Sequence, residues 1–364
     1  MAWHGKINRC RVRAPSAQAG DNGTSFLRFG ESFLATLTPP EAPGAPPHGQ
    51  RLASGLAIAV LGAVAFSGKA IIVKLAYRHG VDAITLLMLR MLLALPFFML
   101  MVWWTGRSRG VIKPLPLTQA DVLGVLWLGF CGYYLASFLD FAGLAYISAS
   151  FERLILYLNP TIVVILGAVL YRRPIRRAQW LGLAISYVGV VLVFGHEVHL
   201  SGEGVWLGSA LVFGSAVSYA LYLSYSGEMV RRLGALRLVG WASCVACVLC
   251  IGQFVLMRPL ESLQTLAPQV WWLSVLNATA CTVIPVVLVM LAIERLGSGL
   301  ASQVGMVGPM STLLMSAWVL GEPLTYWVLG GTVLVLSGVF VCSRSPAAEP
   351  QFSQEVDDGL ANQR

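Results

Sequence analysis

Apolar residues form ten long runs between residues 53 and 342, separated by short polar connections. The runs are 53–76, 82–104, 121–146, 149–171, 178–195, 204–227, 235–257, 270–293, 299–320 and 324–342. Each is close to the roughly 20 residues that a helix needs to cross a bilayer. Because lipid offers no hydrogen-bond partner to an open strand, the runs predict transmembrane helices. The short connections leave no room for an inserted soluble catalytic domain.

The ends of the chain differ from this pattern. Residues 1–50 lack an apolar run and are rich in Gly, Pro, Ala and Ser. They predict either a disordered cytoplasmic extension or an over-long start of the reading frame. Residues 343–364 predict a short cytoplasmic tail. The whole chain is only 12% charged, against about 25% for a soluble domain, which supports an all-α integral membrane protein.

Two stretches of the sequence correspond at a fixed offset of 149 residues. Each has a proline inside an apolar run, a second proline in the next turn and a Gly-x6-Gly pair. The first stretch holds Pro160, Pro174, Gly182 and Gly189, and the second holds Pro309, Pro323, Gly331 and Gly338. This pairing predicts two five-helix repeats, 53–195 and 204–342. Since five is odd, the second repeat must be inverted, and paired prolines in membrane segments are typical of transporters built from such repeats.

Lys and Arg placement predicts the orientation of the spans. With a cytoplasmic N-terminus, nineteen Lys and Arg residues fall on the cytoplasmic side, and only Arg78 and Arg258 fall opposite. Both termini are then cytoplasmic. The loop after the fourth span carries Arg173, and its counterpart after the ninth carries Glu322, as opposite orientation requires. The net charge of +8 is therefore a topology signal and does not indicate nucleic-acid binding.

The two five-helix repeats, with their paired prolines and Gly-x6-Gly motifs, resemble the EamA-type transporters of the drug/metabolite transporter superfamily. The strongest local match is residues 146–160 (YISASFERLILYLNP), and residues 320–325 (LGEPLT) are similar to the turn of the second repeat. One departure is Arg173, where the family's first repeat often has Glu. The resemblance covers about residues 54–342. It implies a secondary transporter for a small organic metabolite in the plasma membrane, the inner membrane in a Gram-negative bacterium, working by alternating access.

The first repeat concentrates ionisable residues inside its spans, where each costs about 2.5–3.5 kcal/mol on insertion scales. At 1.5 Å per residue they all lie within about 5–12 Å of the outer boundary, so we expect one mutually paired cluster. Its net charge of +1 favours an anionic solute, with Arg90 or Lys69 as counter-ion and Asp140 as proton acceptor. The alternatives are an ion-paired lock between helices and, for the two residues nearest the boundary, contact with water. The cluster comprises Lys69, Arg90, Asp140, Glu152 and Arg153.

Two further sets of residues are candidates for the site. Ser215, Ser218, Tyr219 and Tyr222 share one helix face, which lines a cavity or packs against a neighbouring helix. Pro160 and Pro309 each free the carbonyl four residues earlier and predict a bend that shapes a cavity and acts as a hinge, or a simple packing kink.

Two other function classes compete with transport. An intramembrane lipid-modifying enzyme needs a catalytic constellation, but all five histidines lie outside the predicted spans or at their edges. His196, Glu197, His199 and Glu203 fall in a predicted outer loop, where solvation is favoured over a weak metal site. The other rival is a non-transporting scaffold or sensor. The sequence implies no cofactor and no metal, and no nucleotide-binding loop is present. The expected partners are the lipid bilayer and a small-molecule substrate, and the sequence leaves open a homodimer.

Overall fold

The computed structural model describes residues 48–107, 118–171, 174–201, 204–305 and 307–344. The predicted extension (1–50) and tail (343–364) lie almost wholly outside these ranges. The described part is helical throughout, with short turns and no strand. Its residues from Arg51 onward belong to one compact unit, and every contact discussed below lies within it.

The first half holds α2 (His48–Tyr77), α3 (Ala83–Arg107), α4 (Gln119–Leu128), η1 (Gly129–Leu135), α5 (Ala136–Leu144), α6 (Ala149–Leu156), α7 (Asn159–Tyr171) and α8 (Arg177–Ser201). The second half holds α9 (Gly204–Leu233), α10 (Ala235–Met257), η2 (Leu260–Leu263), α11 (Pro268–Ala278), η3 (Thr279–Val283), α12 (Ile284–Gly305), α13 (Val307–Met315), η4 (Ser316–Leu320) and α14 (Tyr326–Arg344). Within the described residues, adjoining elements merge into eight helices long and apolar enough to span a membrane, and Val307–Leu320 and Tyr326–Cys342 form two shorter apolar helices. The predicted all-helical fold with ten apolar segments is confirmed.

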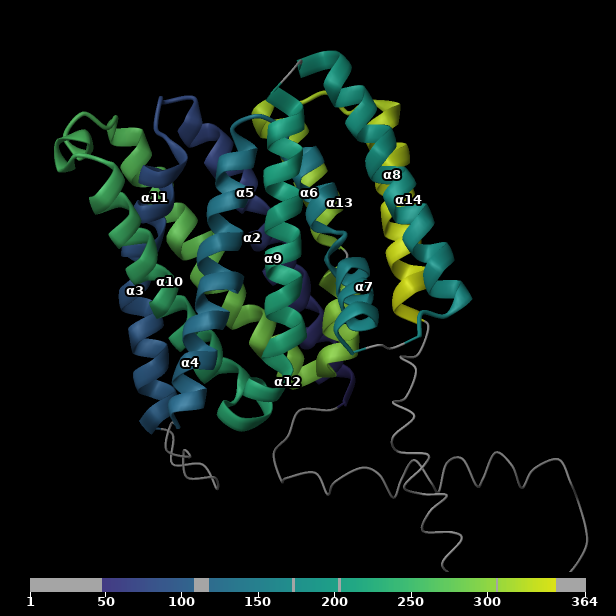
Figure 1. Cartoon of the computed structure of the whole chain (residues 1–364), viewed down its shortest axis with the longest axis horizontal. Coiled ribbons are helices and arrows are strands. Elements are labelled where there is room, and N and C mark those ends of the chain that lie inside the picture. Colours follow the sequence, from purple (N-terminus) through teal and green to yellow (C-terminus); the bar gives the residue numbers. More distant parts are fainter. Residues whose placement is uncertain (1–47, 108–117, 172–173, 202–203, 306, 345–364) are drawn as a thin grey trace, which may run out of the picture. The chain divides into compact units, whose positions relative to one another are not determined.

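The two halves run in opposite directions. The turn before α8 (residues 174–176) lies at the end of the bundle where α2 begins, whereas its counterpart before α14 (residues 321–325) lies at the opposite end (Figure 1). We call this second end the Glu322 end. Arg173 itself lies outside the described residues. The inverted arrangement predicted from the odd number of spans is therefore present.

The Gly-x6-Gly pairs of the two repeats pack against each other where α8 meets α14. A Cβ added at Gly182 would lie 2.6 Å from the carbonyl oxygen of Gly338, and one added at Gly189 would lie 2.8 Å from that of Gly331. A side chain at these positions would separate the backbones, so the close approach requires glycine. The sequence repeat thus marks a contact between repeats.

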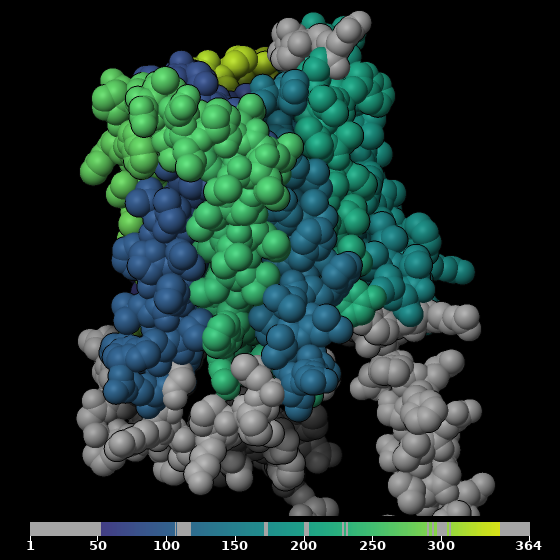
Figure 2. All heavy atoms as spheres, turned by 60° about the vertical axis from the view of Figure 1, so that its left-hand side comes forward, coloured from purple at the N-terminus to yellow at the C-terminus, as the bar shows by residue number. Residues whose placement is uncertain are grey.

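The other helices also pair across the halves. α10 lies between α3 and the α4–α5 segment on the face shown in Figure 2. The Cys247 thiol of α10 donates to the Met91 carbonyl of α3 at 3.2 Å. The Ser215 hydroxyl of α9 donates to the Ala136 carbonyl of α5 at 2.7 Å. These contacts make one core from both repeats.

Two π-helical turns occupy corresponding positions in the third and eighth spans. These are η1 (Gly129–Leu135) and η3 (Thr279–Val283), and the 149-residue offset superimposes them. Tyr133 and Thr282 are equivalent residues within them. A π-turn inserts a residue into the helical repeat and often marks a functional site. Here both turns border the cavity described below.

The turn between α2 and α3 shows how one loop is fixed. Gly80 adopts a φ of +77°, and the Asp82 carboxylate caps α3 by accepting from the Ile84 and Thr85 amides at 3.1 and 3.4 Å. Arg258 donates to the same carboxylate at 3.2 Å. Partial burial opposes ionisation of Asp82, but the hydrogen bonds from Thr85 and the charge of Arg258 outweigh it and lower the pKa of the carboxyl.

Two predicted boundaries were wrong. The expected break between residues 293 and 299 is helical, because α12 continues to Gly305. In the first half, Ser148 makes the corresponding break by capping α6 through the Phe151 amide. The second correction concerns His196, Glu197 and His199, which lie within α8 because that helix continues to Ser201. Glu203 lies outside the described residues. Glu197 is only 6% exposed and is not a solvated loop residue.

Candidate functional site

A cavity of about 370 Å³ lies between the two halves and collects most of the predicted site residues. Its charged lining comes from the first half, through Lys69, Arg90, Asp140 and Arg153. The second half contributes hydroxyl-bearing and apolar side chains. The volume falls within the range of small-molecule sites, roughly 300–1,000 Å³. The polar residues of the second-half wall are Ser215, Tyr219, Ser243 and Thr282.

Lys69 of α2 is the centre of an ion-paired group. Its ammonium donates to Asp140 Oδ2 at 2.5 Å and lies 3.6 Å from Glu152 Oε1. Arg153 Nε lies 4.0 Å from Glu152 Oε2. Glu152 is fully buried and is not among the residues that line the cavity. Contact between Glu152 and water, one of the alternatives from sequence, is therefore excluded. Two cations and two anions balance in this group.

Arg90 of α3 stands apart from that group, which corrects the expectation of one mutually paired cluster. No described carboxylate lies within 4.0 Å of its guanidinium. Its Nε instead donates to the Thr282 hydroxyl at 2.9 Å, and its Cζ lies 5.2 Å from the centre of the Phe141 ring. Nη1 has no hydrogen-bond partner although Arg90 is only 7% exposed. The hydroxyl and the ring take the place that a carboxylate was expected to occupy.

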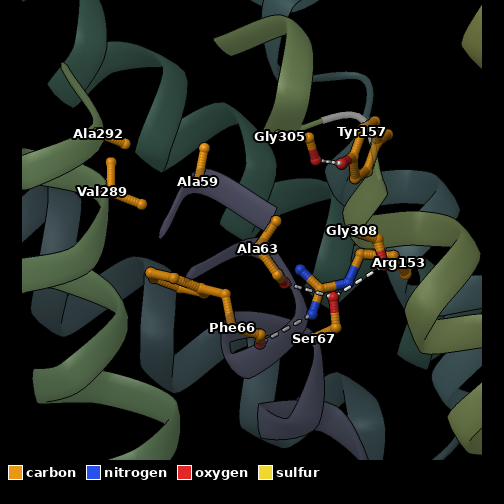
Figure 3. Close-up of a pocket in the computed structure, with 10 residues that line it drawn as sticks. All are labelled: Ala59, Ala63, Phe66, Ser67, Arg153, Tyr157, Val289, Ala292, Gly305 and Gly308. Atoms are coloured by element: carbon orange, nitrogen blue, oxygen red, sulfur yellow. Dashed lines mark hydrogen bonds between the residues drawn. The ribbon is translucent and has the colours of Figure 1, made fainter. Parts of the chain in front are cut away.

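A second hollow of about 210 Å³ adjoins the cavity and shares Phe66, Arg153, Tyr157 and Val289 with it. The Arg153 guanidinium points into this hollow and donates to the Phe66 carbonyl at 3.3 Å (Figure 3). The Ser67 hydroxyl bonds the Gly308 carbonyl of α13 at 2.8 Å. α2 and α6 are thereby joined, and α2 is tied to the second half.

The paired prolines lie in the first turns of α7 and α13. Pro160 is the second residue of α7, and Pro309 is the third residue of α13. The carbonyl freed by Pro160 belongs to Leu156 and accepts from the Asn159 side chain at 2.7 Å. Pro160 thus follows the described break between α6 and α7, where a sequence-based interpretation expected a bend. Residue 306, three residues before Pro309, lies outside the described residues.

The predicted Ser–Tyr face of α9 is divided between the cavity and the core. Tyr219 lines the cavity. Tyr222 packs behind it, at 5.2 Å between ring centroids from Tyr133 of η1, and their hydroxyls lie 3.3 Å apart. Ser218 donates to the Cys131 carbonyl at 2.8 Å. On this face, Tyr219 therefore lines the cavity, whereas Tyr222 and Ser218 pack against a neighbouring helix.

At the Glu322 end, a carboxylate of the second half holds the beginning of α6. Glu322 accepts from the Ala149 amide at 2.8 Å and from the Ser150 amide at 3.2 Å. It also accepts from the Ser150 hydroxyl at 2.8 Å. The Ser148 hydroxyl donates to Glu197. Glu322 thus satisfies two free amides at the positive end of this helix, and Glu197 accepts from the hydroxyl of its N-cap residue, Ser148.

Sequence reasoning missed several cavity residues. Tyr157, Asn159, Tyr133 and Thr282 all contribute to the wall. Tyr133 and Thr282 are equivalent under the 149-residue offset, so a systematic comparison of polar residues at that offset would have found them. Within the described ranges, no three His, Cys, Asp or Glu side chains are grouped to hold a metal ion.

Residues 53–195 and 206–344 each match the EamA-like transporter family. The chain belongs to this family. The duplication has the same boundaries, within a few residues, as the two inverted halves of the fold.

Three relatives from Bacillus subtilis (strain 168) are named uncharacterized transporters. YcbK is 28% identical over 79% of this chain and 93% of its own length. YyaM is 25% identical over 62% of this chain and 74% of its own, and YetK is 22% identical over 66% and 74%. A solved structure titled "Crystal structure of protein" aligns with a TM-score of 0.54 at 17% identity, covering 80% of this chain and 96% of that one. This last similarity concerns the fold alone. Together with the apolar helices, the family makes this chain a multi-pass membrane transporter.

Proposed function

We propose that the chain is a secondary transporter that moves a small organic metabolite across the plasma membrane by alternating access, with both termini in the cytoplasm. The observation that carries the proposal is the cavity between two inverted halves, into which the first half directs its intramembrane charges. Ionisable residues at such depth are costly and mark a functional pathway. The names of the relatives support transport over a lipid-modifying enzyme.

Alternating access requires the halves to move relative to each other around the bound solute. The break before Pro160 supplies a place for such a movement, and Pro309 removes a helical hydrogen bond near the beginning of α13. Lys69, Asp140 and Glu152 supply the coupling group. Protonation of Asp140 would release Lys69 and change the charge of the cavity, which links solute movement to a proton gradient.

The test is solute flux in vesicles reconstituted with the purified full chain. Arg90→Ala and Asp140→Asn are expected to abolish flux while the protein remains folded and inserted. Arg258→Gln, in the partly exposed Asp82 pair outside the cavity, is the control and keeps normal flux. Normal flux in both cavity variants would remove the site hypothesis.

Coupling is tested in the same vesicles by imposing and then collapsing a proton gradient. The wild-type rate is expected to follow the gradient. A rate that ignores the gradient would remove the coupling role of Asp140 and leave the transport proposal in place.

A further inference from the structure

Arg90 is a buried cation with an unused donor. Its Nε is satisfied by Thr282, and its guanidinium lies over Phe141. Arg90 lines the cavity, and its Nη1 is buried without a hydrogen-bond partner among the described residues. Taking a guanidinium out of water without an opposite charge is expensive, and the cost falls when an anion binds it. Arg90 is therefore the place where an anionic group of a solute gains most.

The charge balance of the surrounding residues indicates how many negative charges the site takes. Lys69 and Arg153 are matched by Asp140 and Glu152. Arg90 is the remaining cation among the described residues of the cavity wall. One negative charge on the solute would neutralise the site, whereas two would leave an unpaired anion in a low-dielectric environment.

An apolar groove extends from the cavity. This groove has a volume of about 430 Å³ and is bounded by α3, α10 and α12 with η3. It shares Phe98 and Val286 with the charged cavity. Its other lining residues are Phe97, Leu100, Met101, Trp104, Leu236, Val283, Val287 and Leu291. The groove thus borders the charged cavity at these two residues and carries no charged side chain among its lining residues.

We propose that the cavity takes an organic monoanion with an apolar body, its anionic group on the Arg90 guanidinium and its body directed over Phe98 and Val286 into the groove. The assignment deepens the proposed transport function and rests on it. Arg90 gives a charge-assisted hydrogen bond, and the groove removes apolar surface of the solute from water. A neutral analogue loses the first contribution, and a short anion loses the second.

Binding is measured on the purified full chain in nanodiscs, with 4-phenylbutyrate as the probe. Its amide, the dianion benzylmalonate and acetate serve as comparison ligands. We expect the amide and the dianion to bind at least about tenfold more weakly, because the amide lacks the charge that strengthens the hydrogen bond and the dianion leaves one charge unpaired. Acetate is expected to bind more weakly still. Equal binding of the acid and its amide would overturn the proposal without any mutation.

Two variants locate the parts of the ligand. Arg90→Gln is expected to weaken 4-phenylbutyrate to the level of its amide, while Arg90→Lys recovers part of the loss. Val286→Phe places a larger side chain where the cavity and the groove meet, and it is expected to weaken the binding of 4-phenylbutyrate about fivefold or more. Val255→Phe, on an exposed position of α10, is the matched control. If Arg90→Gln weakens binding and Val286→Phe does not, the groove holds lipid and the apolar-body assignment is wrong.

Failure of this assignment differs from failure of the proposed function. Flux of neutral or cationic solutes with no binding of 4-phenylbutyrate would refute the monoanion site and leave transport intact. Arg90-dependent binding without flux of any solute would support the site and refute transport.

Discussion

The Tyr157 hydroxyl donates a hydrogen bond of 2.7 Å to the Gly305 carbonyl (Figure 3). Gly305 precedes Pro309 by four residues, so its carbonyl is the one that this proline leaves without a helical partner. Tyr157 itself caps the end of α6, directly before the break at Pro160. A side chain at the end of α6 therefore supplies the hydrogen bond that Pro309 cannot donate to Gly305, and the regions of the two paired prolines are linked through this side chain.

Removing that hydroxyl tests the link. Tyr157→Phe leaves the Gly305 carbonyl unsatisfied, and we expect a loss of about 1–3 kcal/mol of stability, measured by chemical denaturation of the purified protein. Tyr326→Phe is the control, because Tyr326 is 93% exposed and its hydroxyl has no hydrogen bond to the described residues. Equal stability of both variants would show that the Tyr157–Gly305 hydrogen bond does not stabilise the contact between the ends of α6 and α12.

The Lys69–Asp140 pair separates the structural and transport roles of the charged group. Breaking a buried pair by removing one partner costs about 3–5 kcal/mol. We expect Lys69→Met to destabilise more than Asp140→Asn, because it leaves Asp140 and Glu152 facing each other with only Arg153 nearby. The double variant should recover much of the lost stability in a double-mutant cycle.

Transport should not recover in that double variant. If stability and flux both return, the group is an ion-paired lock between helices. If only stability returns, Lys69 and Asp140 act in transport.

The sequence located the charged residues but could not assign their partners. Equal depth in neighbouring spans was enough to bring Lys69 and Asp140 together. Arg90 has a similar depth, yet its partner is Thr282, 192 residues away, because helix rotation within the bundle decides which side chain it meets. The Tyr157–Gly305 hydrogen bond could not be predicted from sequence either, since it depends on how the end of α6 packs against the end of α12. The apolar helices and their repeat were predictable from sequence, because lipid requires long apolar runs and the close approach of α8 and α14 requires glycine at regular spacing.

The hold of Glu322 on α6 should contribute to stability. Glu322→Ala removes the acceptor for two amides and one hydroxyl, and loss of a helix cap costs about 0.5–2 kcal/mol. We expect a lower thermal midpoint and weaker flux. Glu322→Gln retains an acceptor oxygen and should fall between the wild type and Glu322→Ala. Glu261→Gln, at an exposed position in η2, should match the wild type; a Glu322→Ala protein as stable as that control would refute the capping role.

The orientation of the halves is accessible to reporter fusions. A reporter placed after Arg176 should be cytoplasmic, and one placed after Glu322 should be external, because these turns lie at opposite ends of the bundle. Alkaline phosphatase and a fluorescent protein give complementary signals on the two sides. Two reporters on the same side would contradict the inverted topology.

Two adjacent glycines test the contact between α8 and α14. A methyl group at Gly331 would lie 2.3 Å from Val193 Cγ2 and 2.9 Å from the Gly189 carbonyl oxygen, whereas one at Gly330 would have no neighbour within 4 Å. Gly331→Ala should therefore destabilise the protein by about 1–3 kcal/mol through overpacking. Gly330→Ala should be neutral or slightly stabilising, since alanine favours the helix by up to about 1 kcal/mol. Denaturation of the two purified variants gives the comparison, and the same response from both would show that α8 and α14 do not approach through this glycine face.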